Sequence, residues 1–147
     1  MAIDISRRSV AEGGGPFGAV IARDGKVIAT GANSVTLKCD PTAHAEVSAI
    51  REACAAEKDF KLAGCEIYSS CEPCPMCLSA IYWAGIDRIY YANTRADAAR
   101  IGFDDSLIYD QIPLNPARRD IPSERLSDDK AAGVFAEWNA KEDKTRY

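Results

Sequence analysis

The residues best suited to chemistry are three closely spaced cysteines, Cys71, Cys74 and Cys77, and the only histidine of the chain, His44. Both neighbouring cysteine pairs read as Cys-x-x-Cys, a spacing found in redox pairs and in metal sites. A catalytic zinc ion takes three protein ligands and leaves its fourth position to water. One histidine and two cysteines supply that number, whereas a closed structural site would need Cys71 or a more remote cysteine as its fourth ligand.

Cys74 and Cys77 form the better pair for a metal. Pro73 fits a turn from a strand into a helix, and cysteines three positions apart on a first helical turn lie on nearby faces. A helix N-terminus also favours the thiolate form of cysteine. Cys71 would then end the preceding strand, and we expect it to be a small buried residue, with a role as a ligand as the alternative.

Glu46 lies two residues after His44 and has three interpretations. It is a solvated residue that the helix dipole favours in a first turn, a fourth metal ligand, or a proton shuttle. Zinc brings the pKa of its bound water near neutrality, and a neighbouring carboxylate can accept that proton and pass it on. Because Glu46 lies beside His44, we favour the shuttle.

The composition is that of an ordinary soluble protein. Of the 147 residues, 47% are apolar and 27% are charged, with a net charge of −4. An acidic chain is a poor default partner for nucleic acid, and no apolar run approaches the roughly 18 residues of a membrane span. The N-terminus does not resemble a signal peptide. We therefore expect a cytoplasmic protein that binds neither nucleic acid nor membrane, with its cysteines as thiols or metal ligands.

Apolar periodicity predicts a single layered α/β domain over residues 1–147, because strands alternate with helices. Asp24-Gly25 joins two apolar runs, which indicates a hairpin. Thr42 is a candidate N-cap for the helix that follows it. Gly85 is expected to end the helix that begins near the cysteines. The remaining elements are a strand over 65–69, a strand over 87–93, helical or turn segments over 96–112 and a helix over 130–141.

Two of these motifs together resemble a known family. The chain reads HAE from His44 and PCPMC from Pro73, and H-x-E followed by P-C-x-x-C is the signature of the zinc-dependent cytidine/deoxycytidylate deaminase superfamily. The resemblance implies that His44, Cys74 and Cys77 bind one Zn²⁺ per subunit and that Glu46 shuttles protons. It also implies a three-layer α/β/α fold with a mixed five-stranded sheet.

Longer stretches look like the bacterial guanine deaminases of this superfamily: GGPFGAVI, DPTAHAEVSAIR, SCEPCPMCLSAIYWA and GFDDSLIY. Those enzymes hydrolyse guanine to xanthine and ammonia, so the resemblance implies a small-molecule purine base as substrate, in purine catabolism or salvage. By the same resemblance, Asn33 would hydrogen-bond the purine, Phe17 would stack on it and Ala45 would belong to the substrate site. Asp105 would be a second catalytic acid near the leaving amine.

The resemblance also implies a homodimer in which the C-terminal segment, about 128–147, is exchanged between subunits and Tyr147 reaches the partner's site. Two departures stand out. The segment before Gly13 is about a helix length shorter than in typical members, which leaves the first helix open. Residues 121–129 are more polar than the usual late strand, which leaves that edge of the sheet open.

Other interpretations remain for the individual residues and for the function. Asn33 suits a turn, Phe17 suits a core, and a terminal Tyr147 would ordinarily be frayed. The substrate could instead be guanosine, cytosine, cytidine or tRNA adenosine. The tRNA substrate calls for a basic surface, whereas the C-terminal region mixes both charge signs. A structural zinc domain and a thiol oxidoreductase are the alternatives outside the deaminases.

Overall fold

The computed structural model describes residues 1–126 and 128–146. The chain divides into two compact units, Met1–Ser106 and Leu107–Tyr147. Tyr147, which the sequence placed at a partner's site, lies outside the described residues. Within the described residues, no helix is long and apolar enough to cross a membrane.

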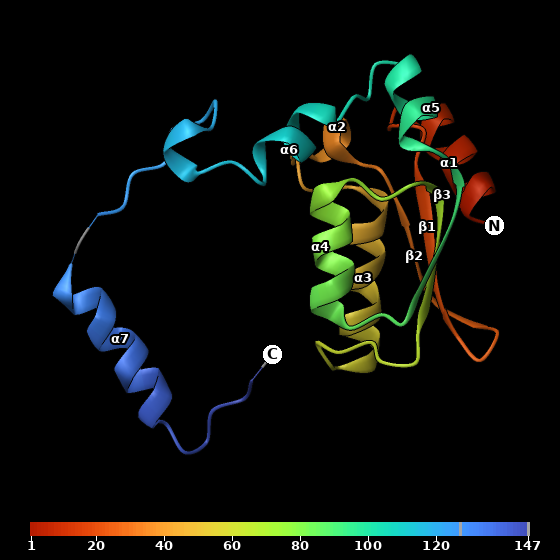
Figure 1. The fold of residues 1–147 in the computed structure, drawn as a ribbon. Coiled ribbons are helices and arrows are strands. Elements are labelled where there is room, and N and C mark those ends of the chain that lie inside the picture. The colour runs from red at the N-terminus through yellow and green to blue at the C-terminus, as the bar shows by residue number, and fades with distance from the viewer. Residues whose placement is uncertain (127, 147) are drawn as a thin grey trace. The chain divides into compact units, whose positions relative to one another are not determined.

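The first unit is built on a mixed sheet of four strands, β1 (Gly18–Arg23), β2 (Lys26–Ala32), β3 (Glu66–Cys71) and β4 (Arg88–Asn93), in the order β2-β1-β3-β4 (Figure 1). β1 is antiparallel to both β2 and β3, and β3 is parallel to β4. The mixed sheet confirms the α/β class that the sequence predicts.

The expectation of a fifth strand is wrong for the part of the chain that the structure describes. The polar stretch at residues 121–126 forms no strand. A strand covers one face of a sheet by alternating apolar and polar side chains, and this stretch has apolar residues only at its two ends.

The predicted hairpin at Asp24-Gly25 is confirmed. Arg23 and Lys26 are paired, so the loop contains only two residues. Both have positive φ angles, 50° for Asp24 and 74° for Gly25. A two-residue hairpin loop with φ positive at both positions is the type I′ turn, for which Asp-Gly is a preferred sequence.

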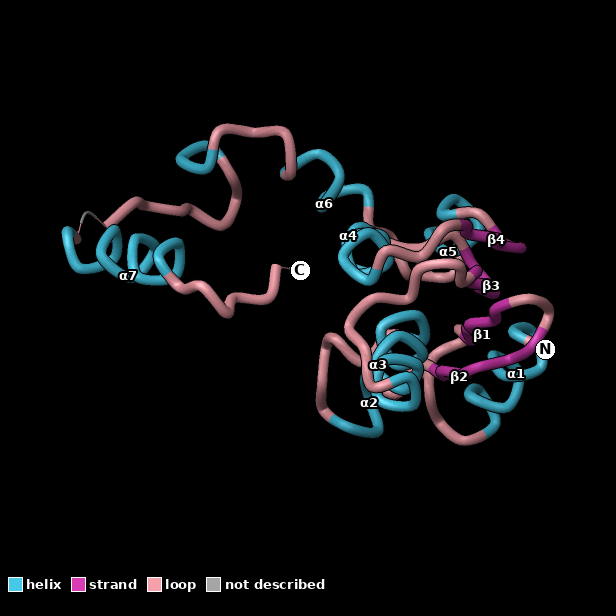
Figure 2. The backbone as a smooth tube through the Cα atoms, turned by 90° about the horizontal axis from the view of Figure 1, so that it is seen from below, coloured by secondary structure: helices cyan, strands magenta, loops and turns pink. Residues whose placement is uncertain are grey.

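Helices cover both faces of the sheet. α3 (Ala45–Glu57) and α4 (Pro75–Ala84) lie together on one side and α1 (Ala2–Ala11) lies on the other (Figure 2). The first helix, which the short N-terminal segment had left open, is therefore present. The other helices are α2 (Val35–Lys38), α5 (Arg95–Arg100), α6 (Ser106–Gln111), the 3₁₀ helix η1 (Pro116–Arg118) and α7 (Asp129–Ala140).

The main core lies between the sheet and the pair α3 and α4, and small side chains let these layers approach closely. Its buried members include Ala19, Ile21, Ala49, Ile67 and Ile81. At Gly31 in β2, an added Cβ atom would lie 2.1 Å from the Ala45 carbonyl oxygen. Only glycine leaves room for the first turn of α3 at this point of the sheet.

The start of α3 differs from the prediction. The N-cap is His44, not Thr42. Both the backbone N–H and the hydroxyl of Thr42 donate to Asp40 Oδ1, at 2.8 and 2.7 Å. Aspartate often bonds the backbone two residues ahead in this way, and such a local turn competes with helix initiation. The helix therefore begins later, with His44 at its boundary.

Candidate active site

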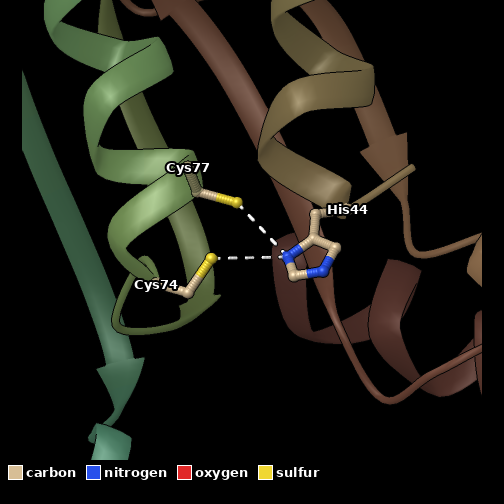
Figure 3. A group of neighbouring side chains, drawn as sticks. All are labelled: His44, Cys74 and Cys77. Carbon is tan, nitrogen blue, oxygen red and sulfur yellow. Dashed lines mark hydrogen bonds between the residues drawn. The ribbon is translucent and has the colours of Figure 1, made fainter. Parts of the chain in front are cut away.

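His44, Cys74 and Cys77 converge at the N-termini of α3 and α4 (Figure 3). His44 is the N-cap of α3, Cys74 is the N-cap of α4, and Cys77 lies one turn into α4. His44 Nδ1 is 3.5 Å from Cys74 Sγ and 3.4 Å from Cys77 Sγ. One ligand atom from each of the three residues lies within 4.8 Å of the other two.

These separations fit a tetrahedral zinc ion. With Zn–N near 2.0–2.1 Å and Zn–S near 2.3 Å, a tetrahedral angle puts the nitrogen and each sulfur about 3.6 Å apart. The two nitrogen–sulfur distances, 3.5 and 3.4 Å, are close to that value. The three donors match the three protein ligands of a catalytic zinc site, in which the fourth coordination position is left open.

Cys71 takes the place that the sequence predicts. It ends β3, it is buried at 4% exposure, and its thiol donates to the Thr94 carbonyl oxygen at 3.6 Å. Among the described residues, the metal-binding group contains His44, Cys74 and Cys77 and does not include Cys71. This arrangement therefore does not provide a closed site in which Cys71 is the fourth ligand.

The two cysteines of the site differ in their proton affinities. Interaction with the Cys77 thiol, and then with His44, lowers the pKa of Cys74 to about 4. The proximity of Cys74, together with burial, raises the pKa of Cys77. The hydrogen bond with Cys74 raises the pKa of His44. Cysteines bind zinc as thiolates, so a bound cation would favour the loss of the proton from each of the two.

Glu46 lies beside the metal-binding group without belonging to it. Its side chain is buried at 5% exposure in the first turn of α3. Oε1 accepts a hydrogen bond from Ser69 Oγ at 2.7 Å, and Oε2 accepts one from Cys77 Sγ at 3.3 Å. The carboxylate therefore lies within hydrogen-bonding distance of one of the three metal-binding side chains.

Ser69 is a site residue that the sequence reasoning missed. The only signal was its strand position, since Ser69 and Ile67 share a face of β3 through the two-residue period, and Ile67 is fully buried. A polar residue on a core face needs a partner. Nothing in the order of residues along the chain identifies that partner as Glu46, 23 positions away.

Ala45 follows His44 in the chain, and Asn33 precedes a residue whose backbone is hydrogen-bonded to the residue before His44. Asn33 is buried at 7% exposure, and its Oδ1 accepts a bond from the Val35 amide at 3.4 Å. The next residue, Ser34, donates its amide to the Ala43 carbonyl at 2.9 Å, which holds this segment beside His44. Ala45 is fully buried.

Phe17 and Asp105 are half-buried. The Phe17 ring meets Phe103 edge to face at 4.9 Å between centroids, and the Phe17 carbonyl accepts the Asn33 amide at 3.0 Å. Phe103 is a second aromatic at this place that the sequence reasoning did not select. Burial, and then the negative charge of Cys74, raise the pKa of Asp105, so this carboxyl lies within electrostatic reach of the metal ligands.

Residues 1–93 match the zinc-binding region of the cytidine and deoxycytidylate deaminase family, and this range contains His44, Glu46, Cys74 and Cys77. The chain is 49% identical over 134 residues to a guanine deaminase of Bacillus subtilis, covering 91% of this chain and 86% of that protein. It is 39% identical over 92 residues to a tRNA-specific adenosine deaminase of Aquifex aeolicus, covering 63% of this chain and 61% of that protein.

The fold agrees with these sequence matches. The X-ray structure of the guanine deaminase from Bacillus subtilis superposes with a TM-score of 0.96 at 47% identity, covering 99% of this chain and 94% of that chain. The metal-binding group, the neighbouring carboxylate, the sequence match and the superposition all agree. This chain belongs to the cytidine and deoxycytidylate deaminase family.

Proposed function

We propose that this protein is a zinc-dependent guanine deaminase that hydrolyses guanine to xanthine and ammonia, as a step of purine catabolism or salvage. The observation that carries the proposal is the convergence of His44, Cys74 and Cys77 within 4.8 Å beside the buried carboxylate of Glu46. The preference for guanine is supported by the relative from Bacillus subtilis, which matches in sequence and fold over nearly the whole chain.

His44, Cys74 and Cys77 would hold the zinc ion in this proposal. Bound there, zinc supplies a positive charge and lowers the pKa of water near the substrate carbon that carries the amine. Glu46 accepts the proton of that water, gives it to a ring nitrogen of the base and helps deliver a proton to the departing ammonia. Asp105 assists the last step as a second acid close to Cys74.

Asn33, Phe17 and Ala45 would hold the base. Asn33 hydrogen-bonds the purine edge, because an amide side chain both donates and accepts. The Phe17 ring stacks on the purine face and is itself supported edge-on by Phe103. Ala45 contributes the first helical position of α3, where the backbone N–H has no partner within the helix.

The proposed active form is a homodimer that exchanges the segment 128–147, with Tyr147 reaching the partner's site. The second unit has only 41 residues, near the size below which a chain usually needs disulfides, a metal or oligomerisation to be stable. Several of its large apolar side chains are exposed, including Ile112 at 56%, Leu126 at 85% and Phe135 at 80%. A second copy of the chain would cover such residues. Sedimentation should then give twice the monomer mass of 15.9 kDa.

We also propose the cytoplasm as the compartment, because none of the six cysteines is in a disulfide in the described part of the chain and such proteins suit a reducing environment.

Ammonia release measured together with bound zinc tests the function. The purified protein is incubated separately with guanine, guanosine, adenine, cytosine, cytidine and a transfer RNA. We expect ammonia from guanine, with one zinc ion per chain. Release from the transfer RNA and not from guanine would favour the activity named for the Aquifex aeolicus relative. Zinc without ammonia from any substrate would support a structural zinc domain.

A further inference from the structure

We propose that Ser69 is a positioning residue for Glu46. Its hydroxyl holds one carboxylate oxygen, so that the other oxygen faces the sulfur of Cys77 and the carboxylate stays beside the metal instead of ligating it. This inference rests on the proposed function, because it assigns Ser69 a part in placing the proton shuttle of that reaction.

The direction of the hydrogen bond follows from the groups around Ser69. The Cys71 backbone N–H, which can only donate, points to Ser69 Oγ at 3.5 Å. Glu46 Oε1 lies on the other side at 2.7 Å and accepts. Because a hydroxyl carries one hydrogen and two lone pairs, Ser69 accepts from Cys71 and donates to Glu46. The Oγ atom is thus a fixed donor aimed at the carboxylate.

The donor is also held rigidly. Ser69 belongs to an inner strand, where it is paired with Ala19 of β1 and Tyr91 of β4. Its side chain is buried at 4% exposure. A position held by strands on both sides and closed to water cannot shift to follow Glu46. The hydroxyl therefore ties the first turn of α3 to the middle of the sheet.

The bond from Ser69 is the contact that does not depend on the metal. The other oxygen of Glu46 contacts Cys77, which is one of the proposed zinc ligands, whereas Ser69 belongs to no metal-binding group among the described residues. Without the hydroxyl, Oε1 loses this donor, and the carboxylate can turn toward the position of the metal. A carboxylate next to an open coordination position can itself bind zinc, and that would remove the base and fill the open position together.

Ser69→Ala tests this role, with Ser70→Ala as the matched control. Ser70 is also a buried serine of β3, at 3% exposure, but its hydroxyl accepts the Gly18 amide at 3.0 Å. Because a hydrogen bond to a charged group is lost, Ser69→Ala should lower kcat for guanine about 10- to 100-fold. KM should stay within about twofold, since the proposal gives Ser69 no contact with the base. Ser69→Thr, which keeps the hydroxyl, should retain most of the wild-type kcat. Ser70→Ala should leave kcat unchanged.

Two further measurements separate positioning from general damage. Protein loaded with Co²⁺ in place of Zn²⁺ should show a changed visible absorption spectrum in Ser69→Ala, and an unchanged one in Ser69→Thr and Ser70→Ala. In a Glu46→Gln background, Ser69→Ala should cause no further loss of kcat, because the two residues act as one unit.

The inference is overturned by a kcat of Ser69→Ala within threefold of wild type, by an unaltered cobalt spectrum, or by the same loss in the Glu46→Gln background. If the wild-type protein with one zinc per chain releases no ammonia from guanine, the proposed function fails instead. The cobalt spectra then still decide whether Ser69 holds the carboxylate.

Discussion

Replacing Gly31 by alanine is a sharp test of how the sheet positions the site. Gly31 lies in β2 beneath the first turn of α3. The added Cβ atom would lie 2.1 Å from the Ala45 carbonyl oxygen and 2.5 Å from the Ala49 amide nitrogen, where ordinary contact begins at 3.4 Å. Both obstacles are backbone atoms, so no side-chain rotation relieves the clash. To restore a contact of 3.4 Å from 2.1 Å, the helix must move away from the strand by about 1.3 Å.

That movement should affect stability and chemistry together, because the same turn carries His44 and Glu46. Overpacking of this kind costs about 3 kcal/mol, and in a chain of this size each kcal/mol lowers Tm by roughly 2–4 °C. We therefore expect Tm to fall by about 6–12 °C in thermal unfolding followed by circular dichroism. A displacement of about 1 Å of catalytic groups typically costs about 100-fold in rate, which guanine turnover below the unfolding range would measure.

Gly133→Ala provides the matched control. It makes the same chemical change inside α7, at a position where an added Cβ atom meets nothing within 4 Å. Because alanine is the better helix former, this variant should be at least as stable as wild type. If Gly31→Ala keeps the wild-type Tm within 2 °C and full turnover, the close contact between β2 and α3 does not position the site, and the reasoning is refuted.

Three further predictions concern the site itself. Glu46→Gln should retain one zinc per chain in metal analysis while guanine turnover falls at least about 100-fold, because the proton shuttle is lost. Cys74→Ser, or treatment of the wild type with a chelator, should remove zinc, stop ammonia release and lower Tm, because a metal bound only to the folded state stabilises it; added zinc should restore the chelated protein. Burial raises the pKa of Asp105 above its unfolded value, so its ionised form opposes folding. In the zinc-free protein, Asp105→Asn should therefore raise Tm at pH 7, and the gain in Tm should vanish as the pH falls to the ordinary carboxyl range; a constant gain at every pH would contradict this assignment. In the zinc-loaded protein, the same variant should lower guanine turnover.

Several turns and helix ends could be predicted from the sequence, because they depend on residues that are neighbours along the chain. Asp24-Gly25 specifies its turn because the two residues tolerate the positive φ angles that a two-residue hairpin needs. Gly85 ends α4 with φ of 67°, for the same reason. The spacing of Cys74 and Cys77 within one helical turn, and of His44 and Glu46 at a helix start, likewise depends on neighbours along the chain.

The incorrect expectations concern features of the fold that are determined by distant residues or by competing interactions. The fifth strand was inferred from resemblance, although residues 121–126 lack the alternation that would bury a face. Thr42 had a suitable side chain for an N-cap, but Asp40 engages it in a local turn. The start of α3 depends on this competition, which residue preferences alone do not rank.

The sequence by itself therefore determined which atoms could bind a metal and move a proton, since ligand type and helical spacing are local properties. Only the tertiary structure decided that His44 meets the two cysteines, that Ser69 is the partner of Glu46, and that Gly31 must have no side chain. These facts join residues from β2, α3, β3 and α4, which lie far apart along the chain. Their distances follow from how the sheet and helices pack, and packing depends on every layer at once.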